Sequence, residues 1–183
     1  AIDFLKKYLK DWLNIEGTEE RDKDKVQEEI ENSVNRQGHK YHISYDLWEM
    51  NEGIHLYSLA SIYSAFDSIL NIYKALGKNV SEFENNRLKE EKIQKNKRTI
   101  ENLQTQLKKY INENLYDEEK KSYVRNTEDR KMDISILGAI TPFNMFKPKE
   151  KKIRNTVERI NMSLRTYTGG YQRFEQDNYM YGN

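Results

Sequence analysis

The spacing of hydrophobic residues along the chain predicts a protein built mostly from helices. Apolar residues recur at steps of three and four over 1–14, 81–115 and 149–165, as expected for helices with one buried face. Residues 18–38 have apolar side chains at wider steps of four and predict a mostly exposed helix. In 54–76, apolar residues occupy nearly every direction around the helix, which predicts burial on most sides. Such a helix needs neighbours on several sides, and the rest of the chain offers few of them.

Glycines and one polar pair mark the expected ends of these helices. Gly17, Gly38 and Gly77 follow the first three helical segments, and glycine is a common residue just after a helix. Ser81 and Glu84 have capping-box spacing at the start of the long polar helix. The apolar seam of that helix is thin, which favours an outer helix lying on a single inner layer. A coiled-coil partner is the alternative.

The segments between the helices are expected to be irregular. Residues 116–131 are polar and turn-like, and 132–138 are apolar again. Pro142 and Pro148 bracket a loop, because proline lacks a backbone donor and interrupts regular structure. Two adjacent glycines, Gly169-Gly170, follow the last helix.

Composition and charge exclude some classes of partner. The 183 residues include 31 Lys and Arg against 30 Asp and Glu, and the net charge of +1 creates no global field that favours nucleic acid or a membrane surface. No apolar run approaches the ~20 residues of a membrane span. The chain has no cysteine, which excludes disulfides and thiolate ligands but does not fix the compartment. We therefore expect neither nucleic acid nor a membrane as partner.

The candidate metal and phosphate ligands of the chain do not form convincing sites. His39 and His42 are three residues apart, but no acidic residue lies between them and a zinc site needs three or four converging ligands. Five basic residues lie near the start of the last helix: Lys147, Lys149, Lys151, Lys152 and Arg154. Glu150 and Glu158 dilute this charge, which favours a solvated helix face over a phosphate site. We expect no metal and no cofactor.

The nine residues 45–53 carry the most distinctive candidate chemistry. Glu49 directly follows Trp48, with Asp46 three residues before it and another glutamate, Glu52, three residues after it. Burial of a carboxyl group against an indole favours its neutral form, which can donate a proton near neutral pH. A polar loop that caps the following helix, with Trp48 as a core anchor, is the structural alternative.

A second polar and aromatic segment follows the paired glycines. Arg173 lies in the sequence Gly-Gly-Tyr-Gln-Arg-Phe, with Glu175 and Asp177 just after it and tyrosines at 179 and 181. Sugar rings pack on aromatic faces, and their hydroxyls bridge to Arg, Asp and Glu, so this composition suits a sugar site. An ordinary Gly-rich connection between helices explains the same residues.

Taken together, these segments resemble glycoside hydrolase family 15, the glucoamylase family, and the likeness is closest to its bacterial members. Tyr-Asp-Leu-Trp-Glu at 45–49 matches the family's general-acid motif. Residues 170–183 match the segment that runs on into Pro-Trp in the family, and 133–137 look like a third landmark between the two. The resemblance is good over 42–76 and 133–183, and three landmarks in family order are more specific than any one of them.

The resemblance implies an (α/α)6 toroid in which inner and outer helices alternate. Residues 1–183 would be a single partial domain, an internal segment of the catalytic domain with both ends cut. By the family match, Glu49 is the general acid of a hydrolase that cleaves α-glucosidic bonds of starch-like oligosaccharides or polysaccharides from the non-reducing end, with inversion. The residues implied around the substrate are Tyr45, Asp46, Trp48, Arg173 and Asp177.

The family match also predicts what is missing from the chain. Inversion needs a second carboxylate ~6.5–9.5 Å from the acid. In the family this general base lies downstream of the segment that ends here, and Glu52, Glu175 and Asp177 do not match its motif. Met50 replaces the second glutamate of the fungal pattern, which puts that leaving-side sugar contact in doubt.

Two alternatives remain open at this stage. One is a related toroid hydrolase that acts on trehalose, dextran or isomalto-oligosaccharides. The other is a non-catalytic helical module, since the regulatory subunits of phosphorylase kinase show that a glucoamylase-like domain can serve regulation. An open segment of a toroid would also leave apolar flanks through which chains could self-associate.

Overall fold

The computed structural model describes residues 44–79 and 87–178. Several expectations concern residues outside these ranges: the helices at 1–14 and 18–38, His39 and His42, the pair Ser81 and Glu84, and the chain end at 179–183. Contacts divide the chain into two compact units, Ala1–Ser44 and Tyr45–Asn183. The fold described below is that of the second unit.

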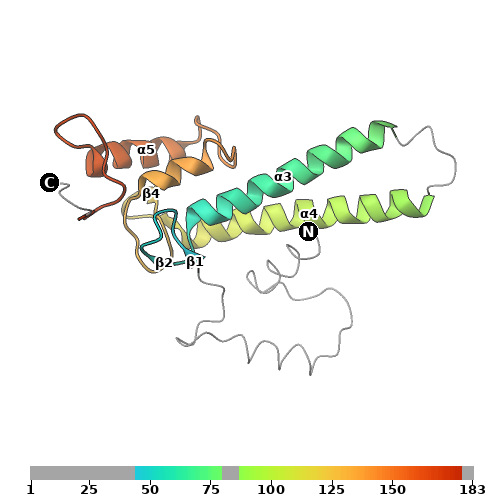
Figure 1. Cartoon of the computed structure of the whole chain (residues 1–183), viewed down its shortest axis with the longest axis horizontal. Helices are drawn as coiled ribbons and strands as arrows, with labels where there is room; N and C mark the ends of the chain where they lie inside the picture. The colour runs from blue at the N-terminus through green and yellow to red at the C-terminus, as the bar shows by residue number, and fades with distance from the viewer. Residues whose placement is uncertain (1–43, 80–86, 179–183) are drawn as a thin grey trace, which may run out of the picture. The chain divides into compact units, whose positions relative to one another are not determined.

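Two long helices, α3 (Leu56–Asn79) and α4 (Arg87–Asn114), lie side by side and run in opposite directions (Figure 1). The buried apolar side chains described in this pair are Leu56, Leu59, Ala60, Phe66 and Leu70 from α3, and Ile100, Leu103, Leu107 and Ile111 from α4. Each of these side chains larger than alanine contributes about 1.5–3 kcal/mol when it leaves water. In the part of the chain that the structure describes, the thin seam of α4 packs against α3, and the position of α4 as an outer helix stays a prediction.

Helix α3 departs from its prediction in two ways. Burial is complete at Leu56, Leu59 and Ala60 near its start, but Ile72 in its second half is 57% exposed. The helix also continues through Gly77 to Asn79, so the stop expected at Gly77 is wrong. A glycine inside a helix costs only about 1 kcal/mol relative to alanine, which does not force the chain out of the helix.

The segment 116–131 is more ordered and more buried than its polar sequence predicts. Strand β3 (Tyr116–Asp117) pairs antiparallel with β4 (Ser122–Tyr123), so the turn-like prediction is wrong for these residues. Tyr123 is fully buried, stacks on Phe146 with ring centroids 4.8 Å apart, and donates a hydrogen bond to Asn112 Oδ1 at 2.7 Å. Burial raises the pKa of Tyr123, so its hydroxyl stays a donor. Isolated tyrosines among charged residues leave no periodic signal of such burial.

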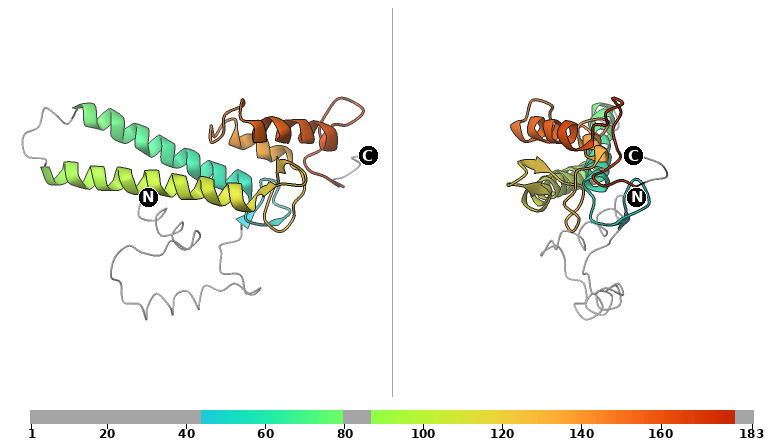
Figure 2. Two further views of the ribbon diagram at one scale, coloured as in Figure 1. Left: turned by 180° about the vertical axis from the view of Figure 1, so that it is seen from behind. Right: turned by 90° about the vertical axis from the view of Figure 1, so that its left-hand side faces the viewer.

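The remaining elements gather at the end of the helix pair where α3 begins and α4 ends (Figure 2). They are the 3-10 helix η2 (Ile134–Ala139), helix α5 (Lys151–Leu164) and the strands β1 (Ser44–Tyr45) and β2 (Glu52–Gly53). Helix α5 buries Ile153, Ile160 and Leu164, which confirms its predicted face. The irregular loop between the prolines is also confirmed, with a cis bond before Pro142.

The described residues are mostly helical. The strands among them are two residues long and form two small sheets. The all-α fold class is therefore confirmed. None of the helices in the described ranges combines the length and the apolar character that crossing a bilayer requires.

Candidate active site

The turn between β1 and β2 is organised by the carboxylate of Asp46. One oxygen, Oδ1, accepts the backbone N–H groups of Trp48 at 3.1 Å and Met50 at 2.9 Å. The other, Oδ2, accepts the side-chain amide of Asn51 at 2.7 Å. The backbone N–H of Glu49 donates to the carbonyl of Asp46 at 3.1 Å. Three successive N–H groups, at 48, 49 and 50, therefore all end on Asp46.

Asp46 is suited to this role because its charged form is the stable one. Burial of the carboxyl group acts to raise its pKa, but the hydrogen bonds from Met50 and Asn51 outweigh that effect. The pKa of Asp46 consequently lies below its ordinary value. Both of its oxygens accept hydrogen bonds inside the turn, and its expected contact with a substrate stays a prediction.

Glu49 lies in this turn in a left-handed conformation, with φ at 55°. A residue with a Cβ atom pays about 1–2 kcal/mol in that region, and such conformations persist where the surroundings over-determine them, often at active sites. The hydrogen bonds to Asp46 on both sides of Glu49 supply that constraint. The side chain itself is exposed, so the desolvation expected from the neighbouring indole is not provided by the described residues.

Trp48 connects the turn to a distant part of the chain. Its Nε1 donates to both carboxylate oxygens of Asp133, at 3.2 and 3.1 Å, although the two residues are 85 positions apart. The guanidinium carbon of Arg173 lies 5.6 Å from the centre of the indole, within the range of a cation–π interaction. The structure thus brings together three segments that lie far apart in the sequence: the turn at 45–53, the segment that begins at Asp133, and the segment that contains Arg173.

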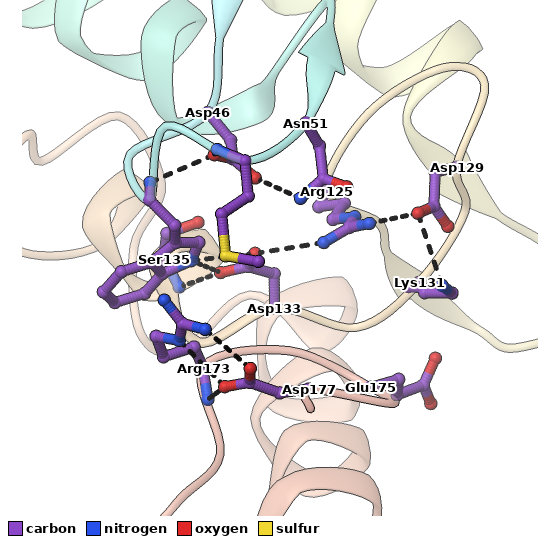
Figure 3. Close-up of polar contacts among 12 residues, drawn as sticks. Asp46, Asn51, Arg125, Asp129, Lys131, Asp133, Ser135, Arg173, Glu175 and Asp177 are labelled. Carbon is purple, nitrogen blue, oxygen red and sulfur yellow. Dashed lines mark hydrogen bonds and ion pairs between the residues drawn. The ribbon is translucent and has the colours of Figure 1, made fainter. Parts of the chain in front are cut away.

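Arg173 is fixed in place by Asp177. The two side chains form a bidentate pair, with Nε 2.8 Å from Oδ2 and Nη2 2.6 Å from Oδ1 (Figure 3). Such a fork-to-fork pair sets orientation as well as distance. The backbone adds to it, because the N–H of Ile134 donates to the carbonyl of Arg173 at 2.8 Å and Asp133 forms a bridge with Phe174.

A charge network centred on the buried residues Arg125 and Asp133 adjoins this contact (Figure 3). Arg125, 2% exposed, places Nη1 3.9 Å from Asp133 Oδ2, bonds Asp129 through Nη2, and stacks over the ring of Phe174 at 4.6 Å. Asp133 is fully buried and caps η2 by accepting the N–H of Ser135 at 2.7 Å. Burial raises the pKa of Asp133, and hydrogen bonds from Ser135 and Trp48 and the charge of Arg125 offset part of that rise.

The other residues near the turn have simpler environments. Tyr45 is 58% exposed. A hydrogen bond with Glu52 and the negative charge of Glu52 raise the pKa of the tyrosine hydroxyl. His55 is buried, and its Nε2 lies 3.0 Å from the carbonyl oxygen of Asn51. Within residues 44–79 and 87–178, no group of three or more His, Cys, Asp or Glu side chains is arranged to hold a metal ion.

The sequence singled out the residues of the turn and of the arginine segment, but not the charged residues that contact them. Arg125 and Asp129 lie in the segment expected to be a polar turn, and nothing in a run of charged residues marks one of them for burial. Asp133 was expected only as a landmark in the chain. The pairing of Arg125 and Asp133 depends on the fold of both segments, which spacing along the chain does not reveal.

The site thus places an acidic turn, a tryptophan and an acid-paired arginine side by side, residue types that suit contact with a sugar. Comparison of sequences is more specific: the profile of glycosyl hydrolases family 15 matches residues 1–183, and the chain belongs to this family. The membership agrees with the (α/α)6 toroid that the resemblance implied.

One curated relative is an uncharacterized glycosyl hydrolase of Methanocaldococcus jannaschii. It is 29% identical to this chain over 139 residues, which are 76% of this chain and 20% of the relative. The aligned part of the chain thus spans about a fifth of the length of that relative.

Proposed function

We propose that the chain is the part of a family 15 enzyme that carries its general acid, Glu49. The reaction would be hydrolysis of terminal α-glucosidic bonds from the non-reducing end of glucose oligosaccharides or polysaccharides, with inversion. One observation carries the assignment of the acid: three successive N–H groups bonded to Asp46 hold Glu49 in a strained conformation, beside the tryptophan that contacts Arg173. The family of the chain supports the reaction class.

In this proposal each residue has a distinct task. Glu49 projects from the turn as an exposed side chain and protonates the glycosidic oxygen as the bond to the leaving sugar breaks. The Arg173 guanidinium, oriented by Asp177, donates hydrogen bonds to sugar hydroxyls. Trp48 offers a ring face to the sugar, and the Tyr45 hydroxyl lies exposed on the adjoining strand. Asp46 holds the turn.

The second carboxylate of the inverting pair would lie outside these 183 residues. That carboxylate binds the attacking water on the opposite face of the sugar, ~6.5–9.5 Å from the acid. Most of the length of the curated relative falls outside the aligned segment and leaves room for such a residue. We therefore propose that the full-length enzyme, and not this chain alone, is the catalyst.

The test compares Glu49→Gln with Glu52→Gln in the full-length enzyme, using maltose and maltotriose. Glu49→Gln should lower kcat by about 10²–10⁴-fold, the usual contribution of a general acid, while Glu52→Gln changes it only a few-fold. Proton NMR should show β-glucose as the first product, as inversion requires. Equal losses in the two variants would contradict the assignment of Glu49.

The substrate is tested in the same experiment by adding trehalose and isomaltose. Met50 is half exposed beside Glu49 and has no carboxylate with which to contact the leaving sugar. Cleavage of trehalose or isomaltose in preference to maltose would assign the enzyme to those linkages and leave the role of Glu49 intact.

A further inference from the structure

Asp133 is a buried carboxylate that the proposed reaction does not use. It is 0% exposed, and each of its oxygens is engaged. Oδ1 accepts from the Ser135 N–H at 2.7 Å and from Trp48 Nε1 at 3.2 Å. Oδ2 accepts from the same indole nitrogen at 3.1 Å and lies 3.9 Å from Arg125 Nη1. Asp133 therefore joins the acid turn to the buried arginine.

The indole of Trp48 has a single polar atom, and Asp133 binds it. This interaction fixes the direction in which the N–H edge of the ring points. The Arg173 guanidinium lies 5.6 Å from the ring centre, so a change in ring orientation changes the surface on which Arg173 packs. Asp133 also bridges Phe174 through its backbone, which anchors the residue next to Arg173.

We propose that Asp133 is a positioning residue of the sugar site, which fixes the Trp48 ring and, through it, the Arg173 guanidinium. Arg125 is the buried partner that supports Asp133, with Nη1 3.9 Å from Oδ2. The expected effect of Asp133 on catalysis rests on the proposed function. A residue that positions a substrate-binding side chain can have a large effect on the rate, since misplacement by about 1 Å can lower a rate by about 10²-fold.

Asp133→Asn is the sharpest substitution because it preserves size and changes only hydrogen bonding. In either orientation the amide places an NH₂ group where an oxygen now accepts. At the Oδ1 position it would face the Ser135 N–H, and at the Oδ2 position it would face Arg125. In both cases it also faces the indole N–H.

The kinetic test is a double-mutant cycle in the full-length enzyme with Asp133→Asn and Trp48→Phe, where phenylalanine keeps an aromatic ring without the N–H. We expect Asp133→Asn to lower kcat/KM by about 10-fold or more in the wild type and by less than about threefold in the Trp48→Phe background. Equal losses in both backgrounds would show that Asp133 supports only the fold and would overturn the proposal.

A second measurement does not depend on catalysis. The 183-residue chain has two tryptophans, so its indole ¹⁵N–¹H spectrum has two signals, and Trp48→Phe identifies one of them. Asp133→Asn should shift the Trp48 signal and speed its hydrogen exchange by about 10-fold or more. The matched control is Asp129→Asn, which changes the other partner of Arg125 but removes no hydrogen bond of Trp48, and it should leave the signal in place.

The two measurements separate the two proposals. If the full-length protein cleaves no α-glucoside, the proposed function fails, and the indole signal alone decides whether Asp133 holds the ring. If the Trp48 signal is unchanged by Asp133→Asn, or moves equally with Asp129→Asn, the positioning role is wrong whatever the enzyme does.

Discussion

At the scale of the residue, the turn between β1 and β2 is organised by the carboxylate of Asp46. Asp46 accepts the N–H groups on both sides of Glu49 and thereby stabilises a backbone conformation that glutamate rarely adopts. The spacing of Asp46 three residues before Glu49 has a physical reason, because it lets the carboxylate reach the N–H groups two and four residues ahead. Asp46 and Glu49 therefore form one structural unit.

Asp46→Asn should destabilise the protein at neutral pH and remove part of its sensitivity to acid. The pKa of Asp46 lies below its ordinary value of 3.8, so its stabilising contribution is fully present above that value and is lost as the pH falls through the lower pKa of the folded state. We expect a loss of about 1–3 kcal/mol in the free energy of unfolding at pH 7, measured with urea.

The difference between wild type and Asp46→Asn should shrink as the pH falls below 3.8. Asp67→Asn, on an exposed part of α3, is the control and should change stability little at pH 7. A difference that stays constant from pH 7 to pH 2.5 (roughly, a range that spans the aspartate pKa) would contradict the role of Asp46.

Among single residues, the sequence predicted those whose type and spacing define a motif. Glu49, Trp48 and Arg173 were singled out in this way, and the structure brings Trp48 and Arg173 together; the catalytic role of Glu49 stays a prediction. Arg125 could not be predicted, because its burial depends on Asp133 and Phe174 arriving from elsewhere in the chain.

At the scale of the element, the long helices follow from the sequence and the short connections do not. Helices α4 and α5 have apolar faces repeated over several turns, and that repetition is what a sequence shows clearly. The β3–β4 hairpin and η2 each use only a few residues, and their burial comes from tertiary contacts. One such contact is the approach of Gly138 in η2 to Tyr57 in α3, where a Cβ atom would lie 2.8 Å from the ring.

Gly138→Ala should therefore separate η2 from α3. The new methyl group would overlap Tyr57, which cannot retreat freely because its ring also packs edge-on against Phe143 at 5.0 Å. We expect a loss of about 1–3 kcal/mol, typical of overpacking, in the free energy of unfolding.

Gly170→Ala is the matched control, since its Cβ atom would meet Thr166 Oγ1 at an ordinary 3.6 Å. Thermal or urea unfolding of the two variants gives the comparison. Equal stability of Gly138→Ala and Gly170→Ala would show that the contact between η2 and α3 is not tightly packed.

At the scale of the whole molecule, the chain belongs to family 15 but aligns with about a fifth of a curated relative. Exposed Ile72 on α3 is the kind of apolar surface that a neighbouring helix would cover in a toroid. Self-association of the 183-residue chain through such surface stays a prediction, and sedimentation velocity over a range of concentrations would test it.

The 183-residue chain should have no appreciable α-glucosidase activity by itself. Loss of one member of a catalytic pair that acts together lowers the rate by several powers of ten, and the base is proposed to lie elsewhere. The measurement is glucose release from maltose and maltotriose by the purified chain. Turnover that disappears with Glu49→Gln would show that the chain contains a complete catalytic pair.

The most direct test of the central claim, that Glu49 is the general acid, is the dependence of the Glu49→Gln defect on the leaving group. A general acid matters when the leaving oxygen must be protonated, and fluoride leaves without such help. In the full-length enzyme, Glu49→Gln should lower kcat/KM for maltose by about 10²–10⁴-fold but for α-glucosyl fluoride by less than about 10-fold. An equal loss on the two substrates would contradict the claim.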